Sequence, residues 1–107
     1  MKTRNKIHLG MLLDKKLDLP GKVERYTYED ATRLILFAIR LRPHEPFLYF
    51  YVATFYSALN KISKSLFYYE EALKRGFQDW EQIYSDVSFE NARNTEKFKA
   101  ITSKYHR

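Results

Sequence analysis

Cysteine is absent from the 107-residue chain, and glycine and proline are scarce, at three residues each. The lack of cysteine excludes disulfide bonds, thiolate metal ligands and a cysteine nucleophile. With so few glycines, the sequence has no glycine-rich loop that could cradle a phosphate. Its apolar runs are shorter than the roughly 20 residues that a bilayer-spanning helix needs. These absences argue against thiol chemistry, phosphate-loop enzymes and a membrane span.

The first residues resemble no targeting segment. Residues 1–16 begin with basic side chains, but they lack the sustained apolar region of a signal peptide. We therefore expect a cytoplasmic protein, while noting that a chain trimmed of its leader would have the same sequence.

The residue types of active sites are present but not grouped. His8, His44 and His106 lie on three separate segments without the spacing of zinc ligands. Each of the carboxylate pairs 29–30 and 70–71 consists of adjacent residues, whose side chains point apart on a helix. We therefore expect no catalytic residues, no metal and no cofactor, and interpret the protein as non-enzymatic.

The most unusual stretch is residues 46–60, PFLYFYVATFYSALN, which contains no charged residue. Pro46 stands where the first turn of a helix tolerates proline. On a helical wheel, apolar and aromatic side chains fall on both faces, whereas a surface helix has one apolar stripe. The sequence therefore predicts a helix over 46–59 that is buried on more than one side.

Further helices flank this stretch. Thr27 and Asp30 fit a capping box that begins a helix, and Pro43 follows its end. Another helix is expected from residue 62 or 63 to 75, before Gly76. Shorter helices are expected after Asp79 and over 95–105, with an irregular piece at 85–94. Residues 7–17 permit a further helix, and residues 18–21 form a turn.

Residues of similar type recur 34 positions apart, which is the period of a helix–turn–helix repeat. The pairs are Ala31 with Ser65, Ile35 with Tyr69, Ala38 with Ala72, and Ile39 with Leu73. In this register the chain resembles the tetratricopeptide repeat family, through Tyr49-x₂-Val52-Ala53-x₂-Tyr56, then Ser65-x₃-Tyr69, and Pro43 in the place of the family's proline.

The C-terminal third also resembles this family. It is similar to the closing segment of many bacterial tetratricopeptide proteins at Gly76, Phe77, Trp80, Ile83, Asp86, Phe89, Arg93, Phe98 and Ile101. The resemblance implies an all-α fold of about five to six helices in a short right-handed superhelix. It divides the chain into an N-terminal arm or displaced first helix (1–26), repeat helices (27–77) and capping helices (78–107).

One departure concerns the first helix of the earlier repeat, which would precede Ala31. Pro20 and Gly21 break that interval. Two alternatives remain open: a loop displaces this helix, or an N-terminal arm covers the open end of a truncated array.

The resemblance also implies a binding site. In tetratricopeptide arrays the first helix of each repeat lines a concave groove that takes peptides. The core pattern requires Tyr49, Val52, Ala53 and Tyr56, so the other face of the helix is expected to line the groove: Phe47, Phe50, Tyr51, Thr54 and Ala58. The expected partner is an apolar peptide, a helix or a second copy of the chain. In the alternative interpretation, the N-terminal arm or the helix 7–17 fills this face.

A formal charge of +6 raises a second possible function. Basic residues cluster near both ends, at residues 2–22 and 97–107, and basic patches beside aromatic side chains bind nucleic acid. The charges are mixed with thirteen acids, and no nucleic-acid-binding motif is present. Nucleic-acid association is therefore the alternative, and protein interaction is the preferred function.

Overall fold

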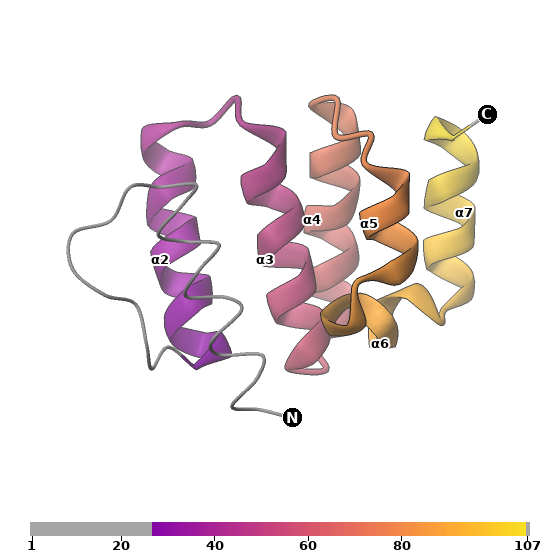
Figure 1. Ribbon diagram of the computed structural model, residues 1–107, viewed down its shortest axis with the longest axis horizontal. Coiled ribbons are helices and arrows are strands. Elements are labelled where there is room, and N and C mark those ends of the chain that lie inside the picture. The colour runs from indigo at the N-terminus through magenta and orange to yellow at the C-terminus, as the bar shows by residue number, and fades with distance from the viewer. Residues whose placement is uncertain (1–26, 107) are drawn as a thin grey trace.

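The computed structural model describes residues 27–106, and these fold entirely into helices and their connections (Figure 1). The expectations for residues 1–26, including the helix 7–17 and the turn 18–21, lie outside the described residues, as does Arg107. The all-α prediction is confirmed. The elements are α2 (Tyr28–Leu41), α3 (Pro46–Ala58), α4 (Ile62–Lys74), α5 (Trp80–Ser85), the 3₁₀ turn η1 (Val87–Phe89), α6 (Glu90–Arg93) and α7 (Glu96–Tyr105).

Helix α2 begins at the predicted capping box. The Asp30 amide donates to Thr27 Oγ1 over 3.0 Å, and the Thr27 amide donates to Asp30 Oδ2 over 3.4 Å. These bonds satisfy two amides that the first turn of a helix leaves without partners. The helix ends at Leu41, shortly before Pro43, as expected.

Helix α3 occupies the centre of the described residues. Pro46 is its first residue, where no amide hydrogen is needed. The helix packs against α2, α4, η1 and α6, so it has neighbours on several sides. Its buried residues run almost continuously from Leu48 to Phe55. The prediction of a helix buried on more than one side is confirmed.

Both tight turns around α4 use a left-handed backbone. Asn60 has φ of 60° and ends the α3–α4 turn, and Gly76 has φ of 99° directly after α4. Asparagine and glycine are the residues that adopt this conformation most readily. The α3–α4 connection is therefore short, and the two helices run antiparallel (Figure 1).

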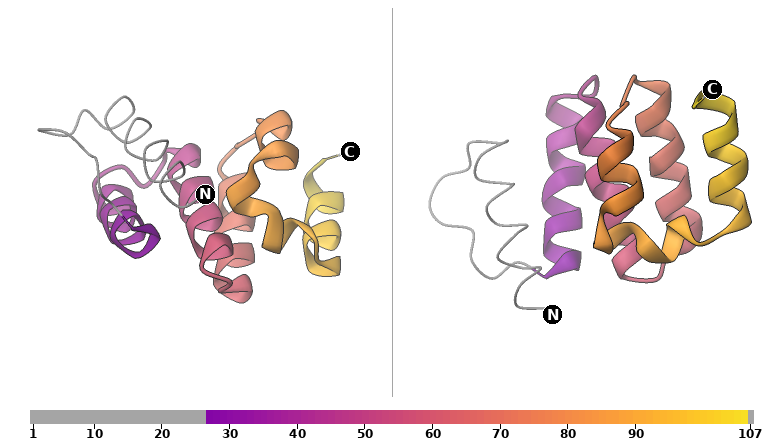
Figure 2. Two further views of the ribbon diagram at one scale, coloured as in Figure 1. Left: turned by 60° about the horizontal axis from the view of Figure 1, so that its bottom comes forward. Right: turned by 45° about the vertical axis from the view of Figure 1, so that its right-hand side comes forward.

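The C-terminal segment is a series of short helices. Asp79 accepts a hydrogen bond from the Gln82 amide at the start of α5, and Thr95 accepts one from the Phe98 amide at the start of α7. The stretch expected to be irregular, 85–94, instead holds η1 and α6. Figures 1 and 2 show α2 and α7 at opposite ends of the described helices, with α3 and α4 between them.

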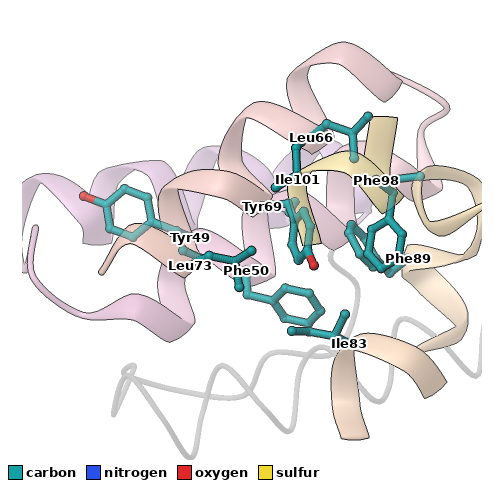
Figure 3. Close-up of a cluster of buried hydrophobic side chains, with 12 residues drawn as sticks. Tyr49, Phe50, Leu66, Tyr69, Leu73, Ile83, Phe89, Phe98 and Ile101 are labelled. Carbon is teal, nitrogen blue, oxygen red and sulfur yellow. The ribbon is translucent and has the colours of Figure 1, made fainter. Parts of the chain in front are cut away.

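The main core joins α3 and α4 to this C-terminal segment (Figure 3). The Tyr69 ring lies 5.2 Å from that of Phe89 and 5.1 Å from that of Phe98, measured between centroids. Phe89 and Phe98 are buried, and Trp80 packs half-buried against the same cluster. These residues therefore cover the apolar face of α4.

The 34-residue pairs of α2 and α4 are alike in burial at two of four positions. Ala31 and its counterpart Ser65 are fully buried, as are Ile35 and its counterpart Tyr69. Ala72 is also fully buried, whereas its counterpart Ala38 is half-buried. Leu73 is buried as well, whereas its counterpart Ile39 is half-buried. Two of the four pairs are therefore buried alike, and in the other two the α4 residue is the more buried.

Buried polar side chains join the elements. Ser65 donates through Oγ to the Ala53 carbonyl over 2.6 Å, which ties α4 to α3. Ser57 Oγ accepts from the Ala92 amide over 2.9 Å, and its carbonyl accepts from Asn91 Nδ2 over 3.1 Å. Because unpaired buried polar groups are costly, these bonds specify how the helices fit together.

Candidate interaction surface

Phe50, a predicted groove residue, lies in the core. Its side chain is fully buried. Its ring stacks on Phe77 with a centroid separation of 4.7 Å and meets Phe89 edge-on at 5.2 Å. Figure 3 shows Phe50 and Ile83 pointing toward one another. The expectation that the core does not need Phe50 is wrong, because the α5–η1 segment packs onto this face of α3.

Tyr51 and Thr54, two further groove residues, are also buried. The Tyr51 ring stacks on Phe55 at 6.4 Å and meets Phe47 edge-on at 5.6 Å. Thr54 donates through Oγ1 to the Tyr51 carbonyl within the helix, over 2.8 Å. The expectation that these two residues lie on an open face outside the core is therefore wrong as well.

Phe47 and Ala58, the remaining predicted residues, are half-buried near opposite ends of α3. The five predicted residues thus share one helix but not one accessible surface. Their role in binding a partner stays a prediction, and Phe47 is the most accessible aromatic side chain among them.

Two carboxylates of the α5–η1 segment act electrostatically on Tyr51. Burial, and then the negative charges of Asp86 and Asp79, raise the pKa of Tyr51 to about 12. Asp79 caps α5, and Asp86 Oδ1 accepts from the Ser88 amide over 2.9 Å. Among residues 27–106, neither aspartate forms an ion pair. The nearest cation is Arg93, whose guanidinium donates to the Asp86 carbonyl over 2.9 Å without pairing with its carboxylate. The edge between α3 and η1 therefore carries two carboxylates that no described side chain engages in an ion pair.

An apolar side chain accompanies these charges. Val87, the first residue of η1, is 58% exposed beside Asp86. Tyr28 of α2 reaches the same turn, because its hydroxyl lies 3.0 Å from Ser88 Oγ. We call Phe47, Tyr51, Asp79, Asp86 and Val87 the α3–η1 edge. Sequence reasoning assigned Asp79 only a capping role, although the absence of Lys and Arg from residues 78–90 was a visible signal of negative charge.

A second feature that sequence reasoning missed anchors the α2–α3 loop. The Pro43 carbonyl accepts from the Tyr49 hydroxyl over 2.8 Å and from Arg75 Nε over 3.2 Å. The Arg75 guanidinium lies 4.1 Å from the Tyr49 ring centroid and pairs with Glu71 at 2.6 Å. No local pattern reveals this cluster, because its members lie far apart in the sequence.

The histidines remain separate in the structure. His44 is exposed in the α2–α3 loop, and the His106 ring stacks on Trp80 at 3.9 Å; His8 lies outside the described residues. Residues 27–106 hold no group of three histidine, aspartate or glutamate side chains suited to a metal ion. Over the same residues, every helix is too short or too polar to cross a membrane.

Comparison of the chain with protein-family models, with curated proteins and with solved structures gives no match in any of the three. The functional interpretation therefore depends on the residues and their geometry.

Proposed function

We propose that this protein is a non-catalytic, tetratricopeptide-like interaction module. The 34-residue register, the like burial of two of its four pairs in α2 and α4, and the closing helices support this proposal. Its partner is an apolar peptide or helix that also carries basic side chains, and it binds along the α3–η1 edge.

The observation that carries the proposal is the combination, at this edge, of apolar surface with two carboxylates that form no ion pair among the described residues. Exposed Val87 offers apolar contact, and Asp79 and Asp86 attract a cation. Buried Phe50 and Tyr51 hold α3 and the α5–η1 segment in place beneath them. A preformed surface lowers the entropy cost of binding.

The test uses a fluorescently labelled amphipathic peptide of leucine and lysine, with a leucine-to-serine version as its control. Asp79→Asn and Asp86→Asn remove the charges, while asparagine still caps a helix. We expect the doubly substituted protein to bind the leucine–lysine peptide at least about 10-fold more weakly than the original chain in fluorescence anisotropy. Val87→Ser is expected to weaken binding as well.

Phe67→Ser is the matched control, because Phe67 is also 58% exposed but lies on α4. Binding that is unchanged by the α3–η1 substitutions, or reduced equally by Phe67→Ser, would contradict the proposal. Phe50 is unsuitable for this test, since its loss perturbs the core.

Nucleic-acid association is tested in the same assay with a labelled single-stranded oligonucleotide. Residues 27–106 carry nearly equal numbers of basic and acidic side chains, so most of the excess positive charge belongs to residues 1–26. Tight oligonucleotide binding that falls steeply with added salt would favour this alternative over peptide binding.

A further inference from the structure

Residues 1–26 carry most of the excess positive charge of the chain. They contain seven basic and three acidic side chains, which gives a net charge of +4 out of +6 for the whole chain. Within them, residues 7–17, IHLGMLLDKKL, combine apolar side chains with the adjacent Lys15 and Lys16. Apolar and basic side chains together are the chemistry that the α3–η1 edge is proposed to bind.

Residues 78–90 carry the opposite charge. They contain four acidic side chains and no Lys or Arg. Two of the four, Asp79 and Asp86, belong to the α3–η1 edge, where they flank the two ends of α5 and form no ion pair among the described residues. Val87, directly after Asp86, is exposed. The segments 1–26 and 78–90 are therefore complementary in charge, and both offer apolar side chains.

The described part of the chain also begins beside this edge. Thr27 caps α2, and the hydroxyl of the next residue, Tyr28, lies 3.0 Å from Ser88 Oγ in η1. Residues 18–26 join residues 7–17 to Thr27, and an extended chain of this length spans about 30 Å, which is enough to reach the edge. A short tether gives an effective concentration on the order of 1 mM, so even a weak contact is occupied.

From these observations we infer that residues 7–17 occupy the α3–η1 edge of their own chain, with Lys15 and Lys16 attracted by Asp79 and Asp86. The inference rests on the proposed function, because it names an occupant of the same edge. It adds that an external partner must displace this segment, which lowers the apparent affinity of the protein for that partner.

Disulfide formation in the full chain tests the contact, because the original sequence contains no cysteine. One chain carries Asp14→Cys with Val87→Cys and is called the 14–87 chain. Its control, the 14–67 chain, carries Asp14→Cys with Phe67→Cys, since Phe67 and Val87 are both 58% exposed. Equilibration with glutathione gives the effective concentration of each thiol pair. We expect it to be at least about 10-fold higher in the 14–87 chain, although loop length alone favours the shorter 14–67 loop.

The tether joins the fold near η1, so proximity alone would also favour position 87, and charge substitutions in the 14–87 chain separate the two causes. Asp79→Asn with Asp86→Asn keeps residues that cap helices, and Lys15→Gln with Lys16→Gln changes the other side of the contact. Each pair of substitutions should lower the effective concentration at least about 3-fold. All four together should lower it no further, because both pairs remove the same contact.

Displacement by an external partner is measured with the labelled leucine–lysine peptide. Lys15→Gln with Lys16→Gln, in the chain without added cysteines, frees the edge, so we expect the peptide to bind at least about 3-fold more tightly in fluorescence anisotropy. The matched control is Lys97→Gln with Lys99→Gln, which removes the same charge from α7 and should leave the affinity unchanged.

The outcomes separate this inference from the proposed function. Equal effective concentrations in the 14–87 and 14–67 chains would overturn the inference, as would a 14–87 value that the charge substitutions leave unchanged or lower additively. Peptide binding that Lys15→Gln with Lys16→Gln does not strengthen would overturn it as well, and would leave the proposed function standing. If the disulfide results are as expected but no chain binds the peptide, the proposed function fails and the inference stands.

Discussion

Helices α2 and α4 are paired by a 34-residue register in the sequence, yet they are buried alike only at some of their inward positions. Ala31 and Ile35 of α2 are buried as completely as Ser65 and Tyr69 of α4. On their outer edges, α4 has the ion pair of Glu71 with Arg75 where α2 has exposed Phe37 and Leu41. The comparison shows that residues of similar type and spacing can be buried alike on two helices, while the outer edges of those helices differ with the neighbours that each helix has.

The largest expected effect tests the inward sides. Tyr69→Ala should lower the free energy of unfolding by about 3–5 kcal/mol, because it empties the space against Phe89 and Phe98. Ile35→Ala, at the equivalent position of α2, should cost about 2–4 kcal/mol. Urea denaturation followed by circular dichroism measures both values.

Tyr69→Phe is the control for this prediction. It removes only the hydroxyl that lies 2.6 Å from Thr102 Oγ1 and should cost about 1 kcal/mol. If alanine at position 69 cost no more than phenylalanine, the packing described for this core would be wrong.

The next largest effect is the loss of stability when leucine replaces Ala72 or its counterpart Ala38. Ala72 is fully buried, so Ala72→Leu should overpack the core and cost about 1–3 kcal/mol. Its counterpart Ala38 is only half-buried, and Ala38→Leu should cost under about 1 kcal/mol. Thermal unfolding of the two proteins distinguishes them, and equal shifts would show that the two helix crossings are equally close.

A smaller effect concerns the outer edges. Arg75→Ala removes the bond to the Pro43 carbonyl and the contact with the Tyr49 ring, and should cost about 1 kcal/mol. Leu41→Ala, at the matched position, should change the stability of the monomer by less than about 0.5 kcal/mol. Urea denaturation midpoints, determined at low protein concentration, measure the stability changes of both variants. A larger cost for Leu41→Ala would mean that its side chain packs against something in the monomer.

The smallest effect depends on pH. The hydrogen bond from Arg75 holds the pKa of Glu71 below its ordinary value of 4.5. A lowered pKa in the folded state stabilises the protein above about pH 4.5, and this contribution is lost as the pH falls through the lowered value. Because the pair lies near the surface, it is worth about 0.5 kcal/mol.

Glu71→Gln should remove this contribution, so its urea midpoint should fall less between pH 7 and pH 3 than that of the original chain. Phe37, the counterpart of Glu71 in α2, cannot titrate, and Phe37→Ala should leave the acid dependence unchanged. Identical pH profiles for the Glu71→Gln and original chains would contradict the prediction.

Local signals predicted the helices well. The capping box at Thr27, the proline at the start of α3 and the left-handed Gly76 all lie where the sequence placed them. These signals act within one turn of the chain, so neighbouring residues suffice to identify them. The stretch 85–94 was missed because a 3₁₀ turn and a one-turn helix are too short to show periodicity.

The candidate surface was harder to predict. The division of α3 into a core face and a groove face came from a family pattern, and it assigned Phe50 to the wrong side. Apolar and aromatic residues lie on both faces of this helix, so no charged residue marks its outside. Ile83 and Phe89 belong to a later part of the chain, and they place Phe50 in the core because they pack against it.

The sequence by itself determined the all-α class, the helix ends, the register that pairs α2 with α4, and the need for α3 to be buried on several sides. These features depend on residue type and spacing along a few turns. Only the tertiary structure decided which aromatic side chains of α3 became core, which carboxylates act on Tyr51, and that Phe37 and Leu41 are exposed. Those outcomes depend on contacts between segments distant in sequence, which helical periodicity does not encode.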